Sequence, residues 1–199
     1  MGGGKPPYTF LRIKYAFSLF EDAISKKEIT KIKKLASKFS DAKTLEEDGS
    51  TVSSKDLNHR DSSVSFINDT WLYTLLYPFI EEANEDSGWK YDIESFEWVQ
   101  IAKYGKDQHY SWHQDGISDH NSPDEHVRKL SLVSVLSNGY EGGELEFKQI
   151  EDEEVRVIQP KMGLGSVVIF PSYQWHRSAP VTKGTKESLA MWCLGPPFR

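Results

Sequence analysis

Six short β-prone runs follow one another in the second half of the chain, and they constrain the fold more than any other feature. Gly, Pro, Asn and Asp separate them, as in Ser137-Asn138-Gly139 and Gly163-Leu164-Gly165. So many short strands within about 110 residues favour a β-sandwich or a jelly roll. The runs are residues 96–104, 130–136, 144–147, 155–158, 166–170 and 188–194.

The first third of the chain has helical periodicity instead. Ser25-Lys26-Lys27-Glu28 is a capping-box pattern that opens an amphipathic segment. After a short strand at 64–67, Asn68 or Asp69 caps a second helix, which Pro78 is expected to bend. We expect both helices to pack on one outer face of the β core, giving a mainly β protein with flanking helices. Their apolar positions are Ile29, Ile32, Leu35, Ala36 and Phe39 in the first, and Trp71, Leu72, Leu75, Leu76, Phe79 and Ile80 in the second.

The length of 199 residues suits a single domain. We predict a flexible N-terminus at 1–7 and one domain at 8–199, with helical support at about 8–88 and the β core at about 89–199. The polar segment 40–62 is expected to be a long loop, either disordered or acting as a lid.

The composition limits the partners and the compartment. The net charge of −6 argues against nucleic acid, because binding a phosphate backbone requires a concentrated basic surface. The basic cluster between Lys26 and Lys38 is interpreted as the solvated face of the first helix. The single cysteine, Cys193, excludes an internal disulfide, suits a reducing compartment and lies in an apolar run, so we expect a buried, unreactive thiol. No secretory signal or membrane span is visible, and we expect a cytoplasmic protein.

His113-Gln114-Asp115, His176 and, ten residues later, Lys186 are the candidate catalytic constellation. Two imidazoles and one carboxylate are the facial triad that binds non-haem Fe(II) and leaves coordination positions open. A second His-x-Asp, His59-Arg60-Asp61, lacks the basic residue ten positions on, which only His176 has among the six histidines. Polar surface residues in a turn remain the alternative for His113 and Asp115. A zinc site with three ligands and a water gives Lys186 no role, so iron is favoured.

Lys186 also stands out by its place in the last predicted strand. A lysine within a mostly apolar strand is costly unless an anion meets it, such as the distal carboxylate of a dicarboxylate co-substrate. The alternative is that Lys186 lies at the mouth of the strand and extends to water. Alternation places Lys186, Ser188, Ala190 and Trp192 on one face, and Leu189, Met191 and Cys193 on the other.

Taken together, the motifs resemble those of the Fe(II)/2-oxoglutarate-dependent dioxygenases, most closely the prolyl 4-hydroxylase-like branch. The resemblance covers residues 58 to 195 and rests on Tyr104–Asp115, Gly142–Leu145, Phe170-Pro171 and His176–Trp192. It implies a double-stranded β-helix (jelly-roll) core.

The resemblance also implies roles for individual residues. His113, Asp115 and His176 would bind iron as the catalytic centre, and Lys186 would bind the 5-carboxylate of 2-oxoglutarate. Tyr104 would hydrogen-bond the same co-substrate, with Ser188 assisting. The implied reaction consumes O2 and 2-oxoglutarate, releases succinate and CO2, and hydroxylates an unactivated C–H bond, with ascorbate as a reductant.

The substrate implied by the resemblance is a prolyl residue in an intracellular protein or peptide. Tyr110 and Trp192 are candidates for the substrate side of the pocket, with core packing as an equal alternative. The polar stretch 116–129 and the segment 40–62 are candidate lids over a peptide. A hydroxylase of a free amino acid or another small metabolite, and a non-catalytic jelly-roll binding module, remain alternatives. The oligomeric state and the physiological target stay open.

Overall fold

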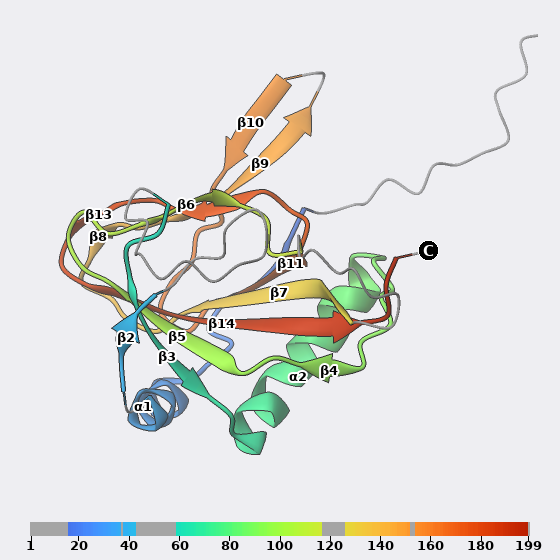
Figure 1. Cartoon of the computed structure of the whole chain (residues 1–199), viewed down its shortest axis with the longest axis horizontal. Helices are drawn as coiled ribbons and strands as arrows, with labels where there is room; N and C mark the ends of the chain where they lie inside the picture. Colours follow the sequence, from blue (N-terminus) through green and yellow to red (C-terminus); the bar gives the residue numbers. More distant parts are fainter. Residues whose placement is uncertain (1–15, 37, 43–58, 117–125, 152–153, 199) are drawn as a thin grey trace, which may run out of the picture.

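The computed structural model describes residues 16–36, 38–42, 59–116, 126–151 and 154–198, and Figure 1 shows their arrangement. Two helices lie in this part of the chain, α1 (Lys26–Leu35) and α2 (Thr70–Asp86). The strands are β1 (Ser18–Phe20), β2 (Ser40–Asp41), β3 (Ser63–Ile67), β4 (Ser95–Phe96), β5 (Val99–Tyr104), β6 (Tyr110–His113), β7 (Val127–Val135), β8 (Glu141–Gly142), β9 (Leu145–Glu151), β10 (Glu154–Ile158), β11 (Val167–Pro171), β12 (His176–Ser178), β13 (Val181–Lys183) and β14 (Lys186–Gly195).

The strands form a jelly roll of two antiparallel sheets. The major sheet has the order β1-β11-β7-β14-β5-β3-β2, with β4 also paired to β14. The minor sheet has the order β10-β9-β12-β6, and β13 and β8 form a separate two-stranded ribbon. In Figure 1 the minor sheet lies above the major sheet, α1 lies below the major sheet, and α2 runs obliquely behind its right-hand end. This is the predicted fold class, with the helices on one face.

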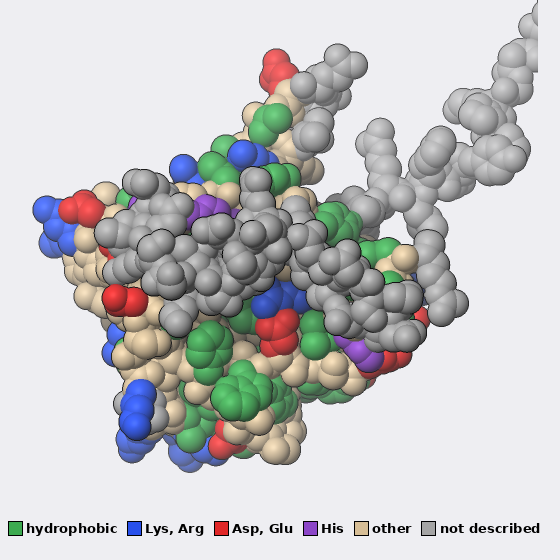
Figure 2. Space-filling model, viewed as in Figure 1, with side chains coloured by type: hydrophobic (Ala, Val, Ile, Leu, Met, Phe, Trp, Pro, Cys, Tyr) green, Lys and Arg blue, Asp and Glu red, His purple; other side chains and the backbone are tan. Residues whose placement is uncertain are grey.

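Local signals explain where the helices begin. The hydroxyl of Ser25 accepts a hydrogen bond from the backbone N–H of Glu28, and the Glu28 carboxylate accepts one from the N–H of Ser25, so the capping box is complete. The carboxylate of Asp69 accepts from the N–H of Trp71 and caps α2. Helix α2 continues through Pro78 to Asp86. The lysines of α1 are exposed, and blue side chains gather at the corner of the molecule that α1 occupies (Figure 2).

Alternation along the strands divides the interior into two layers. The outer layer packs α1 and α2 against the major sheet, where the side chains of Ile101, Leu189 and Met191 meet Ile32 and Leu72. The inner layer lies between the sheets and is built by these residues: Leu145 and Phe147 of β9 and Val168 and Phe170 of β11, joined by Phe17, Leu19, Val133 and Met162. Successive residues of β11 therefore serve opposite layers.

Several details differ from the sequence predictions. The first helix ends at Leu35, so Phe39 packs on the core from beyond it. The run 96–104 is interrupted at Glu97 and Trp98 and forms two strands, β4 and β5. The segment 40–62 is not wholly a loop, since Ser40 and Asp41 pair with β3. The stretch 116–129 is likewise shortened, because β7 already begins at Val127.

Some predicted segments lie outside the described residues, namely the flexible segment 1–7 and the portions 43–58 and 117–125 of the two proposed lids. The single-domain boundaries stay a prediction. Cys193 is fully buried, and burial raises the pKa of its thiol, which fits the expected unreactive cysteine. Within the described ranges, neither helix has the length and apolar character needed to cross a bilayer.

Candidate metal centre

Two short strands of the minor sheet bring the predicted ligands together. His113 is the last residue of β6, His176 is the first residue of β12, and the two are direct cross-strand partners. Side chains of paired residues point to the same face of a sheet, and here that face is turned toward the major sheet. The ring of His176 is also held by the edge of Phe170, with centroids 4.7 Å apart. The sequence analysis predicted neither of these strands.

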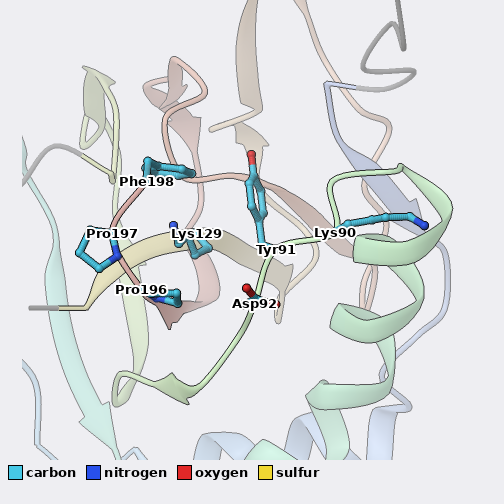
Figure 3. A pocket seen from close by; sticks show the side chains of 7 residues that line it. All are labelled: Lys90, Tyr91, Asp92, Lys129, Pro196, Pro197 and Phe198. Carbon is cyan, nitrogen blue, oxygen red and sulfur yellow. The ribbon is translucent and has the colours of Figure 1, made fainter. Parts of the chain in front are cut away.

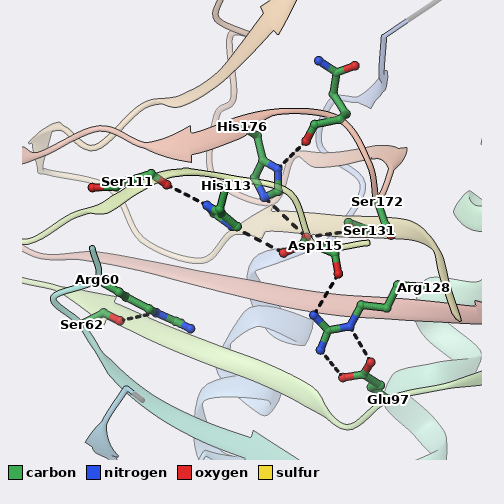
Figure 4. A network of polar contacts seen from close by, with 11 residues as sticks. Arg60, Ser62, Glu97, Ser111, His113, Asp115, Arg128, Ser131, Ser172 and His176 are labelled. Carbon is green, nitrogen blue, oxygen red and sulfur yellow. Dashed lines mark hydrogen bonds and ion pairs between the residues drawn. The ribbon is translucent and has the colours of Figure 1, made fainter. Parts of the chain in front are cut away.

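The loop after β6 adds the carboxylate. Asp115 is positioned by its backbone N–H, which donates to the carbonyl of Ser172 at 2.8 Å. Its Oδ1 lies 3.5 Å from Nε2 of His113, and its Oδ2 lies 3.5 Å from Nε2 of His176. One candidate ligand atom from each of the three residues lies within 4.8 Å of the others. Figure 4 shows the three side chains converging from β6, β12 and the loop.

Hydrogen bonds fix the chemical form of both imidazoles. Nδ1 of His113 lies 2.8 Å from the carbonyl of Ser111, and Nδ1 of His176 lies 2.9 Å from the carbonyl of Gln174. A carbonyl only accepts, so each Nδ1 carries the proton and donates it. The Nε2 lone pairs are then free and directed at the shared centre, as a metal site requires.

The charge states also suit a divalent metal. Burial lowers the pKa of His176 to about 4, only partly offset by Asp115, so the ring is neutral at neutral pH. Burial alone would raise the pKa of Asp115, but His176, His113 and Arg128 outweigh it and hold that pKa below its usual range. Oδ2 of Asp115 accepts a hydrogen bond from the Ser131 hydroxyl at 2.8 Å. The donor set is therefore two imidazole Nε2 atoms and one oriented carboxylate, which fits Fe(II).

Lys186 is buried inside the jelly roll. It is 4% exposed, and its Nζ donates to the carbonyl of Gly143 at 2.6 Å and to the hydroxyl of Ser178 at 2.8 Å. The alternative in which Lys186 extends to water is therefore wrong. Burial lowers its pKa to about 8, partly offset by Glu144. Lys186 also lies directly opposite Tyr104 across β14 and β5, with Nζ 5.4 Å from the ring centroid.

The two other residues predicted to bind the co-substrate also lie on the inner side of the jelly roll. Tyr104 and Ser188 are buried, on β5 and β14 respectively. Gly143 has a φ of +71°, and a Cβ at this position would lie 3.1 Å from Cδ of Lys186. A glycine at this position therefore permits both the positive φ of the turn and the close approach of the lysine side chain.

The two predicted substrate-side aromatics are near the ligands. The ring of Tyr110 stacks on His113, with centroids 3.6 Å apart and planes at 15°. Trp192 lies beneath the guanidinium of Arg128, with Cζ 4.2 Å from the ring centroid. Arg128 donates to the Asp115 carbonyl at 3.5 Å and binds Glu97 through two hydrogen bonds of 2.6 Å.

Two arginines beside the ligands were missed from the sequence. Simple alternation places Arg128 on the same face as Leu130, away from the site. A register shift between Cys193 and Leu194 makes Lys129 an extra residue in β7 and returns Arg128 to the inner side. Arg60 was set aside as part of the second His-x-Asp pattern, yet it pairs with Tyr110 through an isolated β-bridge. No sequence signal reveals either contact, because both depend on register.

A concavity of about 380 Å³ lies elsewhere, near the end of β14 (Figure 3). Lys129, Tyr91 and Phe198 are among its lining residues, and the ammonium of Lys129 lies 3.5 Å from the ring centroid of Phe198. None of the three candidate ligands lines it. We place no part of the metal centre there.

The sequence-family model of the 2OG-Fe(II) oxygenase superfamily matches residues 99–194 of this chain. A PKHD-type hydroxylase of Gloeothece citriformis is 38% identical over 63 residues, which are 32% of this chain and 27% of that protein. A PKHD-type hydroxylase of Alteromonas mediterranea is 31% identical over 94 residues, which are 45% of this chain and 40% of that protein. The chain thus spans less than half the length of either relative.

Solved structures share the fold over nearly the whole chain. A viral collagen prolyl hydroxylase from Paramecium bursaria Chlorella virus-1 has a TM-score of 0.66 at 18% identity, covering 92% of this chain and 97% of that one. A prolyl hydroxylase from Trichoplax adhaerens, solved with a peptide fragment of the hypoxia inducible factor oxygen degradation domain, has a TM-score of 0.65 at 14% identity. The coverage is 90% of this chain and 84% of the Trichoplax chain.

Proposed function

Because this chain belongs to the 2OG-Fe(II) oxygenase superfamily, we propose that it is a 2-oxoglutarate- and Fe(II)-dependent dioxygenase. It hydroxylates an unactivated C–H bond and releases succinate and CO2, and its favoured substrate is a prolyl residue in a protein or peptide. Bound iron supplies the activation of O2 at an open coordination position. The protein supplies the ligands, the pocket and the orientation of both substrates.

The observation that carries this proposal is the convergence of two Nε2 lone pairs and one carboxylate next to a buried lysine. His113, Asp115 and His176 hold the metal. Lys186, already fixed by two hydrogen bonds, binds the distal carboxylate of 2-oxoglutarate as a compact cation. Tyr104, directly opposite Lys186, donates its phenol proton to the same co-substrate, and Ser188 borders it. A non-catalytic module has no need for this combination.

The substrate side is proposed to include Tyr110 and Trp192. Tyr110 covers one face of His113, so it shields the metal ligand from water and limits the approach of the substrate. Trp192 contacts Arg128, which in turn donates to the backbone carbonyl of Asp115. The similarity to prolyl hydroxylases, one of them solved with a peptide, supports a proline-containing peptide as the substrate.

The experiment has two stages. Anaerobic addition of Fe(II) and 2-oxoglutarate should produce a weak visible charge-transfer absorption, which requires both to bind at one centre. Aerobic incubation with proline-rich peptides, and separately with free amino acids, is then followed by succinate release and by a mass gain of one oxygen atom. Oxygen gain only in free amino acids would favour the small-metabolite alternative. No absorption band and no succinate with any substrate would leave the fold as a binding scaffold.

The cellular compartment and the reductant are part of the same proposal. A single buried cysteine suits a reducing compartment, so we propose a cytoplasmic enzyme. Ascorbate is proposed as the reductant that restores Fe(II), and omitting it from multiple-turnover assays should lower the total product.

A further inference from the structure

Arg60 lies beside the proposed metal centre, and no acidic side chain in the described part of the chain forms an ion pair with it. The segment from His59 to Asp61 runs antiparallel to the start of β6, held by backbone hydrogen bonds from Ser111 to His59 and between Asp61 and His109. This pairing places the Arg60 guanidinium over the ring of Tyr110, with Cζ 4.5 Å from the centroid. The other face of that ring carries His113 at 3.6 Å, where no guanidinium would fit. Only the Tyr110 ring therefore separates Arg60 from a candidate metal ligand.

The guanidinium is buried and incompletely bonded. Arg60 is 7% exposed, and its Nε donates to the Ser62 hydroxyl at 3.1 Å. One of its terminal nitrogens, Nη2, is buried and has no hydrogen-bond partner among the described residues. No ion pair joins Arg60 to a carboxylate in the described part of the chain, and the neighbouring Asp61 accepts instead from the side-chain amide of Gln108 at 2.8 Å. A buried donor left unbonded is costly, which indicates that a ligand completes it.

Arg128 provides the contrast within the same site. Figure 4 shows Arg60 and Arg128 extending toward the same side of the ligand triad. Both charges act on Tyr110, since each lowers the pKa of its phenol, although burial dominates and raises that pKa to about 12. Arg128 is neutralised by Glu97 through two hydrogen bonds. Arg60 has no such partner in the ranges that the structure describes.

A count of charges indicates that the missing ligand carries a negative charge. Asp115 offsets one charge of a bound Fe(II), and the two carboxylates of 2-oxoglutarate offset the other charge of the metal and that of Lys186. Glu97 offsets Arg128. Among these described groups, Arg60 is then the cation whose charge no anion balances. A buried unpaired charge is strongly unfavourable.

We propose that Arg60 forms an oxyanion subsite that binds a carboxylate of the hydroxylated substrate, next to the carbon that reacts. This inference rests on the proposed function and narrows its substrate to one that carries a carboxylate near the target residue. Two sources supply that chemistry: the α-carboxylate of a terminal or free residue, and the side chain of an adjacent acidic residue. The planar guanidinium suits either, because it can bind both carboxylate oxygens.

Binding is measured anaerobically, by calorimetry, on protein loaded with Fe(II) and 2-oxoglutarate, so no turnover is needed. The probes are N-acetyl-L-proline against N-acetyl-L-prolinamide, and an amidated peptide containing Asp-Pro against its Asn-Pro counterpart. In one of these pairs the acid should bind about 10-fold to 100-fold more tightly than its neutral analogue, as expected for a charge-assisted hydrogen bond. The pair that shows the preference identifies the source of the carboxylate.

Variants test whether Arg60 causes the preference. Arg60→Met should remove it, while Arg60→Lys should retain part of it, since the charge stays and the fork is lost. Arg156→Met, the same change on the exposed strand β10, should keep the full preference. The affinity for 2-oxoglutarate should be unchanged in Arg60→Met, which separates this subsite from Lys186. Thermal unfolding of each variant checks that the fold is intact.

The outcomes separate the two proposals. Equal binding of acid and neutral probes, failure of both acids to bind, or an acid preference that survives Arg60→Met would overturn the subsite. Loss of the acid preference in Arg60→Met, with part of it retained in Arg60→Lys, would support the subsite. If acids bind through Arg60 but no succinate forms with any substrate, the proposed hydroxylase function fails while the subsite stands.

Discussion

His113 and His176 lie directly opposite each other on adjacent strands of the minor sheet, and each ring presents a free Nε2 to the carboxylate of Asp115. The geometry depends on a two-strand register and on two backbone carbonyls that hold the opposite ring nitrogens. Substitution of either histidine is therefore expected to lower the affinity for the metal directly.

His176→Ala should abolish Fe(II) binding, because two ligands cannot replace the facial triad. Lys186→Met should retain iron and instead raise the 2-oxoglutarate concentration needed for binding. Metal content after anaerobic loading and dialysis, followed by titration with 2-oxoglutarate, measures both. His126→Ala, a change at an exposed histidine, is the control and should behave as wild type. Equal loss of iron in the His176 and Lys186 variants would contradict the division of roles.

Binding of 2-oxoglutarate should weaken as the pH rises through about 8. Burial lowers the pKa of Lys186 to about 8, so above this pH the free protein increasingly holds a neutral amine that cannot pair with a carboxylate. Below this pH the ammonium is formed and affinity should level off. Equilibrium titrations between pH 6.5 and 9.5 measure the effect, with a slope approaching about tenfold per pH unit at the alkaline end. In Lys186→Met the affinity should be weak and independent of pH over this range.

Ser131→Ala should weaken metal binding by about 10-fold to 100-fold, because the hydroxyl orients Asp115 through a hydrogen bond of 2.8 Å. The matched control is Ser134→Ala on the same strand, whose buried hydroxyl has no hydrogen-bond partner within the described segments. That change should leave metal affinity unaltered and cost no stability. Competition with a metal chelator gives both affinities. Similar losses in the two variants would show that the Ser131 hydroxyl has no special role.

Gly143→Ala should weaken 2-oxoglutarate binding without affecting iron. The φ of +71° strains any other residue, and the added methyl group would lie 2.9 Å from Val181 Cγ2 and 3.1 Å from Lys186 Cδ. Gly139→Ala is the control, since its φ of +76° imposes the same backbone strain while its Cβ meets no atom within 4 Å. Titration of both variants separates displacement of Lys186 from simple strain. An equal effect on the two would assign the loss to the backbone.

Phe170→Ala should destabilise the fold by about 3–5 kcal/mol, because the ring is fully buried between the sheets and its loss leaves a cavity. Chemical denaturation measures the free energy of unfolding. Phe66→Ala, at a ring that is 53% exposed, should cost about 1 kcal/mol or less. Since Phe170 also contacts the ring of His176, iron affinity should fall in the first variant alone.

The sequence by itself determined the elements whose signals are local. The capping box at Ser25, the cap at Asp69 and the alternation in β14 depend on neighbours within a few residues, and the structure confirms each. The candidate site residues could also be found from the sequence, because His113, Asp115, His176 and Lys186 follow a spacing that no other histidine in the chain matches.

Only the tertiary structure decided which residues surround that set. The strands carrying His113 and His176 are too short to show periodicity, so cross-strand register alone creates their pairing. The same applies to Arg128, which a bulge returns to the inner side, and to Arg60, which reaches Tyr110 through a bridge to a distant segment. Register and bulges arise from contacts between strands far apart in the chain, where no local pattern records them.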